Sequence, residues 1–306
     1  MTIEYLAGNR IRGTSTERGN YPTTVTSGFW DVSTGVEVGS AFSGTAINTL
    51  FMKPDGTQLY TLEGNDLKEY SLSVAFDITS TLTNTSTMTI GFGSDKLGLE
   101  IGDGGTKIYI GTNGTDSIYQ YNMATAWDLS TVSYSNNVVS CSCLFPTGIN
   151  FNTTGTKMIV SAPASEIATW SLSTAWDLST ATKGTTYTLT DTTDTRGLFI
   201  KPDGMKFWCC DVNASNLEIN EYALATAWDL STLSYVDSLI IGDFPNNVSI
   251  KSDGTSMFVA MGGTGSGIDQ YDIGFTSVLT VQDGSIFYET DTNKSYVLYS
   301  GSWSEL

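Results

Sequence analysis

A repeat of about 50 residues is the feature that most limits what this chain can fold into. Each copy contains a short turn, of which residues 53–57 (Lys-Pro-Asp-Gly-Thr) are the clearest example. The turn glycines are 49 or 50 residues apart and are Gly56, Gly105, Gly155, Gly204 and Gly254. A second segment, Trp-Asp-Leu-Ser-Thr, alternates with the turns at 127–131, 176–180 and 228–232, with weaker copies at 30–34 and 76–80. So regular a period indicates a repeat architecture in which each copy is one structural unit.

Each copy is predicted to consist of antiparallel β-strands. Apolar residues lie four and six positions before every turn glycine, as Leu50 and Met52 do before Gly56, and a period of two is typical of a strand with one buried face. Proline, aspartate and glycine together suit a tight hairpin turn. A second strand follows the turn, a third surrounds an aromatic residue such as Tyr121, and a fourth follows the Trp-Asp segment. Four such strands are the pattern of one β-propeller blade.

The five copies predict an all-β fold, namely a five-bladed β-propeller. The last copy has no Trp-Asp segment after its third strand, whereas the first copy is preceded by an unpartnered one at 30–34 and by a strand-like stretch at 35–43. We therefore expect an N-terminal outer strand to complete the last blade and close the ring, which would leave no open sheet edge at the join. An open β-solenoid is the competing architecture.

Two short segments lie outside the predicted ring. Residues 1–27 are a polar N-terminal arm with a basic cluster at Arg10, Arg12 and Arg18, residues 28–277 are the propeller, and residues 278–306 are a C-terminal β-hairpin segment. A lone hairpin is only marginally stable in water. We therefore expect the hairpin to pack on the ring, on the arm or on a neighbouring chain, as an attachment or oligomerisation segment.

Composition excludes several classes of function. The formal net charge of −18 argues against binding a nucleic-acid backbone, and the absence of histidine excludes Ser-His-Asp and Cys-His nucleophiles and the usual catalytic zinc sites. No stretch has the pattern of an export signal or a membrane span, so neither is expected, and no cofactor is predicted. The four cysteines are interpreted as small apolar strand residues, with a disulfide or metal role as the alternative: Cys141, Cys143, Cys209 and Cys210.

A glycosidase-like activity would require a pair of carboxylates at the mouth of the central channel. Alignment of the first strands on their turn glycines places five residues at the position five upstream: Phe51, Glu100, Asn150, Phe199 and Ser249. Only Glu100 among them is acidic. Asp191, Asp194 and Asp243 lie in loops that lead into first strands, but nothing in the sequence brings them together. No catalytic residue and no metal ligand is therefore predicted, and the aspartates that recur in the Trp-Asp segments are interpreted as turn caps.

A binding face is predicted on the side of the loops that lead into the first strands. Polar and aromatic residues in these loops depart from the repeat and would gather on one face of the disc, where they would form a shallow site for a glycan or protein partner. The residues proposed for this face are Phe145, Arg196, Asp243, Phe244 and Asn246.

The repeat resembles those of propellers in structural proteins of marine tailed phages and related environmental viruses. The resemblance rests on the turn at 53–57, the Tyr-Gln-Tyr strand at 119–121 and the Ala-Trp-Asp-Leu-Ser-Thr segment at 126–131. The C-terminal segments 284–299 and 301–306 are similar to a short hairpin that recurs in phage tail, fibre and capsid-associated proteins, and residues 4–13 resemble the starts of such chains. The propeller part covers roughly four-fifths of the chain and is specific for fold rather than for function.

This resemblance implies a non-enzymatic virion structural protein of the tail, fibre or capsid surface. The propeller would be a binding and display module for a host surface glycan, a host protein or another virion protein. The termini would attach it to the particle or assemble it into a homo-oligomer. The expected location is the virion, an extracellular particle assembled in the host cytoplasm. The alternative is an extracellular microbial glycan-binding or glycoside-hydrolase-like propeller.

Overall fold

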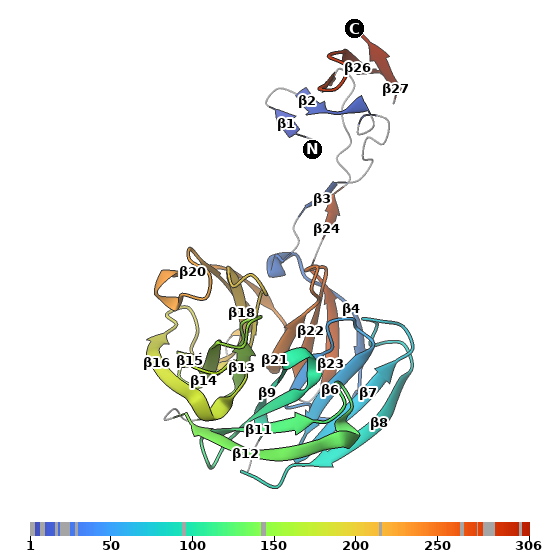
Figure 1. Ribbon diagram of the computed structural model, residues 1–306. Coiled ribbons are helices and arrows are strands. Elements are labelled where there is room, and N and C mark those ends of the chain that lie inside the picture. Colours follow the sequence, from blue (N-terminus) through green and yellow to red (C-terminus); the bar gives the residue numbers. More distant parts are fainter. Residues whose placement is uncertain are drawn as a thin grey trace. The chain divides into compact units, whose positions relative to one another are not determined.

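The chain folds into two compact units, which are described separately. The computed structural model describes residues 4–6, 10–15, 18, 25–27, 30–93, 96–141, 145–213, 216–263, 266–273, 275–277, 285–299 and 302–306. The larger unit comprises Phe29–Gly274, and the smaller unit combines Met1–Gly28 with Phe275–Leu306 (Figure 1).

Five four-stranded antiparallel sheets make up the described part of the larger unit, which confirms the predicted all-β class. The strands of the first three sheets, in order, are β5 (Thr49–Met52), β6 (Gln58–Glu63), β7 (Asp66–Leu72), β8 (Leu82–Thr89), β9 (Lys96–Gly102), β10 (Lys107–Thr112), β11 (Ser117–Met123), β12 (Val132–Ser140), β13 (Gly148–Phe151), β14 (Lys157–Ala162), β15 (Glu166–Leu172) and β16 (Ala181–Thr188). The other two contain β17 (Thr195–Ile200), β18 (Lys206–Asn213), β19 (Asn216–Leu224), β20 (Leu233–Ile240), β21 (Pro245–Ile250), β22 (Ser256–Met261), β23 (Gly267–Asp272) and β4 (Val36–Ala41).

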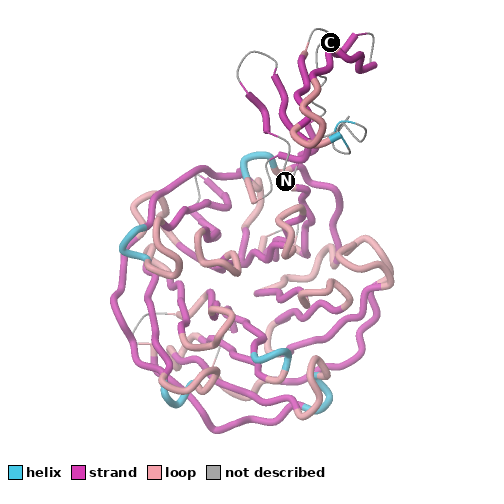
Figure 2. Tube along the Cα trace, turned by 45° about the horizontal axis from the view of Figure 1, so that its top comes forward, coloured by secondary structure: helices cyan, strands magenta, loops and turns pink. Residues whose placement is uncertain are grey.

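The sheets are arranged around a common centre (Figure 2). The first strand of each sheet contacts the first strand of the next, and β21 of the last sheet contacts β5 of the first. The core lies between neighbouring sheets. Leu62 of the first sheet and Ile108 of the second belong to one buried cluster, while Leu59 of the first sheet and Phe258 of the last belong to another. Second strands are buried on both faces, whereas fourth strands alternate between exposed and half-buried residues.

The last sheet of the larger unit is completed by an N-terminal strand. β4 pairs antiparallel with β23 in the register Asp269↔Ser40 and Gln270↔Gly39, so strands far apart in the sequence lie side by side. This is the pairing expected from the unpartnered Trp-Asp segment at the N-terminal side of the first copy.

A backbone contact between the two repeated segments holds each sheet together. In all five copies the aromatic residue of the Trp-Asp segment has a positive φ and donates its backbone N–H to the carbonyl of a turn glycine. The N···O distance is 3.0 Å from Trp228 to Gly204 and 3.1 Å from Trp30 to Gly254. The ring lies on the bare glycine: a Cβ on Gly204 would be 2.1 Å from Cδ1 of Trp228. Glycine is thus required by both its φ of +73° and the missing side chain.

The aspartates of the Trp-Asp segments cap the turns that follow. Asp128, for example, accepts the backbone N–H of Ser130 at 3.0 Å at the start of a short 3₁₀ helix, as an N-cap residue does. The equivalent helices of the larger unit are η1 (Val32–Thr34), η3 (Leu129–Thr131), η4 (Leu178–Thr180) and η5 (Leu230–Thr232), and a further one, η2 (Asp103–Gly105), lies in the second turn.

These turns are also fixed to the neighbouring sheet by a Glu or Gln on the third strand, which is buried in three copies and half-buried at Gln270. The sequence reasoning missed this feature. Each of these side chains accepts the backbone N–H of the apolar residue after the capping aspartate in another copy. The pairs, with their N···O distances, are Glu69 and Leu129 at 2.8 Å, Gln120 and Leu178 at 2.9 Å, Glu221 and Val32 at 3.2 Å, and Gln270 and Ile78 at 3.2 Å. The third copy has Thr169 at this position. The contacts therefore link neighbouring sheets, including the last to the first.

The smaller unit is built from both ends of the chain. Its five-stranded sheet has the order β1 (Glu4–Leu6), β2 (Arg10–Gly13), β25 (Ile286–Glu289), β26 (Ser295–Tyr299) and β27 (Ser302–Glu305), and a two-stranded ribbon joins β3 (Val25–Ser27) to β24 (Phe275–Ser277). β2 and β25 run parallel. Arg18 makes a 2.5 Å ion pair with the buried Glu289, and its guanidinium carbon lies 3.7 Å from the centre of the Tyr296 ring. The C-terminal hairpin thus packs on the N-terminal arm, one of the three places considered for it.

Three of the four cysteines are described, and all three are buried. Cys209 and Cys210 are neighbours on β18, are fully inaccessible, and are free thiols that pack in two different core clusters. Burial raises the pKa of both thiols, so they stay protonated and unreactive. Cys143 lies outside the described residues.

We expect Gly204→Ala to destabilise the larger unit far more than Gly64→Ala. Both glycines have a positive φ, but nothing lies within 4 Å of a Cβ on Gly64. An alanine at either site should cost about 1–2 kcal/mol for the left-handed backbone. At Gly204 the clash with the indole should add about 1–3 kcal/mol. Urea unfolding of the full chain measures the free energy of unfolding of both variants. Equal losses of stability would contradict the contact between the Trp228 ring and Gly204.

Candidate functional site

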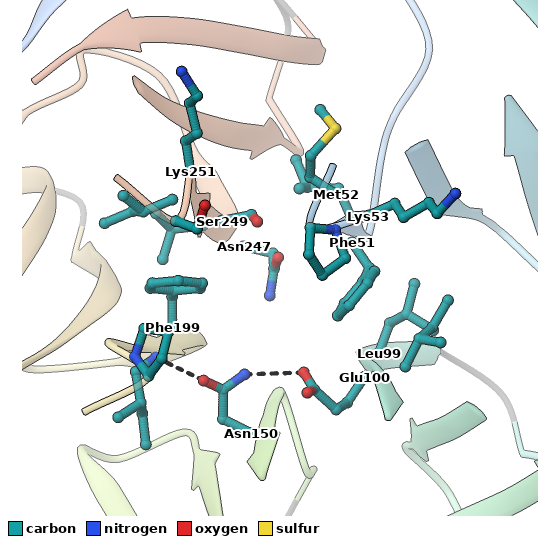
Figure 3. Close-up of a pocket in the computed structure, with 18 of the residues that line it drawn as sticks. Phe51, Met52, Lys53, Leu99, Glu100, Asn150, Phe199, Asn247, Ser249 and Lys251 are labelled. Carbon is teal, nitrogen blue, oxygen red and sulfur yellow. Dashed lines mark hydrogen bonds between the residues drawn. The ribbon is translucent and has the colours of Figure 1, made fainter. Parts of the chain in front are cut away.

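The larger unit contains a central cavity of about 250 Å³ (Figure 3). It is lined by the ends of all five first strands and by parts of the hairpin turns that follow them. Lys53, Pro202 and Lys251 belong to these turns, so the cavity lies toward the side of the unit where the turns are, which we call the hairpin face.

Five equivalent side chains form the wall of this cavity. Because residues alternate between the two sides of a strand, the position five residues before each turn glycine points toward the centre. The structure places the residues found there in the cavity lining: Phe51, Glu100, Asn150, Phe199 and Ser249. Two phenyl rings, a carboxyl, an amide and a hydroxyl therefore share one small space (Figure 3).

Glycine closes the other end of the cavity. Three copies have glycine seven residues before the turn glycine, and in two of them a Cβ would strike the backbone of the next first strand: the distance from Gly197 to Cα of Asn247 would be 2.4 Å, and from Gly148 to the amide nitrogen of Leu198 it would be 2.6 Å. Asn247 occupies the same position in the last copy and lines the cavity, while no residue further upstream in any first strand does. This layer is the floor of a cup that opens on the hairpin face.

Asn150 is held firmly in the wall. Its Nδ2 donates to Oε2 of Glu100 at 3.0 Å, and its Oδ1 accepts the backbone N–H of Ile200 at 2.6 Å. Asn247 differs, because it is 4% exposed and its Oδ1 has no hydrogen-bond partner in the described part of the chain. Asn247 was missed by sequence reasoning, although an amide in place of a repeated glycine was the available signal.

Burial raises the pKa of Glu100 well above its ordinary value of 4.5, although the hydrogen bonds from Asn150 and from the backbone of Phe151 oppose the shift. The Glu100 side chain is half-buried, and the part that stays exposed faces the cavity. Removal from bulk water disfavours the ionised form. Burial therefore shifts Glu100 toward its neutral form, which can donate as well as accept a hydrogen bond.

The lysines of the hairpin turns belong to the rim and are already paired. Lys53 Nζ lies 3.0 Å from Asp55 and 5.7 Å from the centre of the Trp127 ring. Lys251 Nζ lies 2.8 Å from Asp253 and 5.0 Å from the Phe76 ring. Both side chains point away from the centre of the cavity in Figure 3. Among the described residues, the lining thus carries no cation that is free to bind an anion.

The five residues predicted for a binding face do not line the cavity. Arg196 and Phe244 are brought together, with the guanidinium carbon 5.6 Å from the ring centre, and Arg196 lies 3.7 Å from Asp194. Asn246 donates to the carbonyl of Ile47 at 3.0 Å. Asp243 Oδ1 accepts the backbone N–H of Phe244 at 2.7 Å, and Phe145 precedes β13 with a φ of +62°. These residues stay a prediction for the side opposite the hairpin face, which we call the loop face.

Of the acidic residues considered for catalysis, Glu100 alone lines the cavity. The carboxylate of Asp211 receives the backbone N–H of Asp194 at 3.2 Å, in the turn that leads into β17. No group of three or more Cys, Asp or Glu side chains suited to a metal ion occurs in the described ranges. Within those ranges, no helix is both long and apolar enough to cross a membrane.

Comparison with known proteins bears on the fold alone. No protein-family model matches the chain, and no curated protein matches it. A candidate 6-phosphogluconolactonase of Bacteroides fragilis is similar in structure with a TM-score of 0.50 at 11% identity, over 90% of this chain and 95% of that one. A functionally unknown protein of Desulfotomaculum acetoxidans gives a TM-score of 0.47 at 15% identity, over 92% and 80% of the two chains. The first likeness supports a propeller-like all-β fold.

We expect Glu100→Gln to reduce the pH dependence of stability. Because the folded-state pKa of Glu100 is raised, its contribution is fully present below its ordinary value of 4.5 and is lost as the pH rises through the folded value. Glutamine cannot ionise. The free energy of unfolding of the variant, relative to the wild type, should therefore increase between acidic and neutral pH. Parallel urea titrations measure it, and a constant difference would show that Glu100 is ionised normally.

Proposed function

We propose that the larger unit is a five-bladed β-propeller whose ring is closed by β4. Three observations support this: five sheets of the same strand order, contacts from each first strand to the next and from β21 to β5, and the placement of Trp30 on the turn glycine of the last copy. Closure of the ring would bring all five first strands around one axis and would create the cavity.

We further propose that this propeller is a non-catalytic binding and display module of a virion structural protein. The observation that carries the binding role is the cavity itself, a preformed cup with aromatic walls and hydrogen-bonding groups. Its partner would be a host surface glycan or a protein. The smaller unit, in which the two ends of the chain form one sheet, would attach the propeller to other virion proteins or to copies of itself.

A glycoside-hydrolase-like or lactonase-like activity is the second candidate. It is favoured by Glu100, because a carboxyl with a raised pKa in a cavity is typical of a general acid, and by the name of the Bacteroides fragilis protein. Against it, hydrolysis of a glycosidic bond uses two carboxyl groups, and Glu100 is the one carboxyl among the lining residues of the described chain.

We expect Ser249→Phe to abolish binding of the full chain to receptor-bearing cells or to particle proteins. Phenylalanine already occupies the equivalent position in two copies, as Phe51 and Phe199, so the backbone should accept it while the new ring fills the cavity. Phe244→Ala on the loop face is the control and should leave binding unchanged. Retained binding in Ser249→Phe together with loss in Phe244→Ala would move the site to the loop face.

The virion role is tested separately. Antibodies against the full chain should decorate purified particles in negative-stain electron microscopy. Recovery of the chain only in the particle-free supernatant after ultracentrifugation would contradict this part of the proposal without bearing on the cavity.

A further inference from the structure

The cavity contains hydrogen-bonding groups that the fold leaves unused. Asn247 is buried, and its Oδ1 is enclosed without a hydrogen-bond partner in the described chain, while its amide nitrogen points into the cavity in Figure 3. The hydroxyl of Ser249, on the same strand two residues later, has no side-chain hydrogen bond within the described chain. Hydroxyl groups of a ligand in the cavity could accept a hydrogen bond from the Asn247 amide and exchange one with the Ser249 hydroxyl.

The apolar parts of the wall are arranged for a flat, ring-shaped ligand. Phe51 and Phe199 come from opposite sides of the cavity, and the polar side chains lie between them: Asn247 and Ser249 on one side, Glu100 with Asn150 on the other (Figure 3). A ring with C–H groups on its faces and hydroxyl groups around its edge would match this alternation of apolar and polar surfaces.

The charges around the cavity favour a neutral ligand. Lys53 and Lys251 are paired with aspartates of their own turns and point away. A negatively charged ligand would meet no unpaired cation among the described lining residues and would lie beside Glu100, whose hydrogen bond to Asn150 fixes it in the wall. An anion or a cation would each be desolvated without a matching charge.

The shape of the cavity limits how much of a ligand can enter. Its volume of about 250 Å³ is below the range of about 300–1,000 Å³ that is common for drug-sized ligands. The close approach of the first strands at Gly148 and Gly197 closes the floor. A polymer therefore could not pass through the cup, and only the end of a chain could be inserted.

From this geometry we infer that the cavity binds the terminal, neutral sugar ring of a glycan, held between Phe51 and Phe199 and hydrogen-bonded by Asn247, Ser249 and Glu100. The inference rests on the proposed role of this cavity as the binding site and names its ligand class. The cavity would therefore recognise the end of a glycan chain and not its interior.

The test is binding of the full chain to a panel of sugars by isothermal titration calorimetry. The panel contains the methyl glycosides of galactose, glucose, mannose and fucose, together with glucuronic acid and glucosamine as charged counterparts. We expect at least one neutral methyl glycoside to bind, with a more than tenfold weaker affinity in Asn247→Ala and in Ser249→Ala. Asn84→Ala, which removes an exposed amide on β8 outside the cavity and the loop face, is the matched control and should bind as the wild type does.

The other outcomes would overturn separate parts of the proposal. Binding of glucuronic acid or glucosamine alone would overturn the neutral-ligand inference while leaving the cavity as the site. A bulky acetal on the terminal ring should prevent an oligosaccharide from binding. If the blocked and unblocked oligosaccharides bind with equal affinity, end recognition is overturned. No binding by any sugar, with Ser249→Phe still abolishing attachment to cells, would overturn the ligand class alone. Unchanged attachment by Ser249→Phe would instead overturn the proposed function. Thermal unfolding of each variant identifies any loss that comes from misfolding.

Discussion

An aromatic ring that lies on the bare backbone of a hairpin glycine is the contact on which the larger unit depends. It joins the turn between the first and second strands of a sheet to the segment that leads into its fourth strand, through a backbone hydrogen bond such as that from Trp176 to Gly155. The glycine needs its positive φ and cannot carry a side chain. In the last sheet the ring belongs to Trp30, at the other end of the unit, so the same local contact also joins the two ends.

The cavity follows from this arrangement. Neighbouring first strands approach closely at the position seven residues before the turn glycine, where Gly148 and Gly197 stand in two copies, and the five wall residues lie at the next inward-facing position. The wall is therefore set by strand alternation, and its chemistry by five residues that the repeat leaves free to vary. Phe51 and Phe199 are identical, whereas Glu100, Asn150 and Ser249 differ. Such variation at one position of a regular repeat gives the cavity chemically different walls.

Local features were predictable from the sequence, and contacts between sheets were not. The strands, the turns, the capping role of the aspartates and the inward position of Glu100 all follow from residues within one copy. The acceptor role of Glu69 toward Leu129 depends on how two sheets are tilted against each other, and a single copy carries no information on that tilt. Asn247 replaces a repeated glycine, which is visible in the sequence, but its place at the cavity follows only from the packing of the first strands. The group at Phe145, Arg196, Asp243, Phe244 and Asn246 was inferred from loops that depart from the repeat, and the structure brings Arg196 and Phe244 together outside the central cavity.

In the proposed five-bladed ring, β4 completes the last sheet, and the cavity requires all five first strands to surround one axis. Amide hydrogen exchange of the full chain, followed by mass spectrometry, compares β4 with β20, the equivalent edge strand of the fourth sheet. If β4 is an integral strand of the last sheet, its amides that face β23 should be protected as strongly as those of β20 that face β19. Unprotected amides throughout β4, with β20 protected, would show that the N-terminal strand does not close the ring.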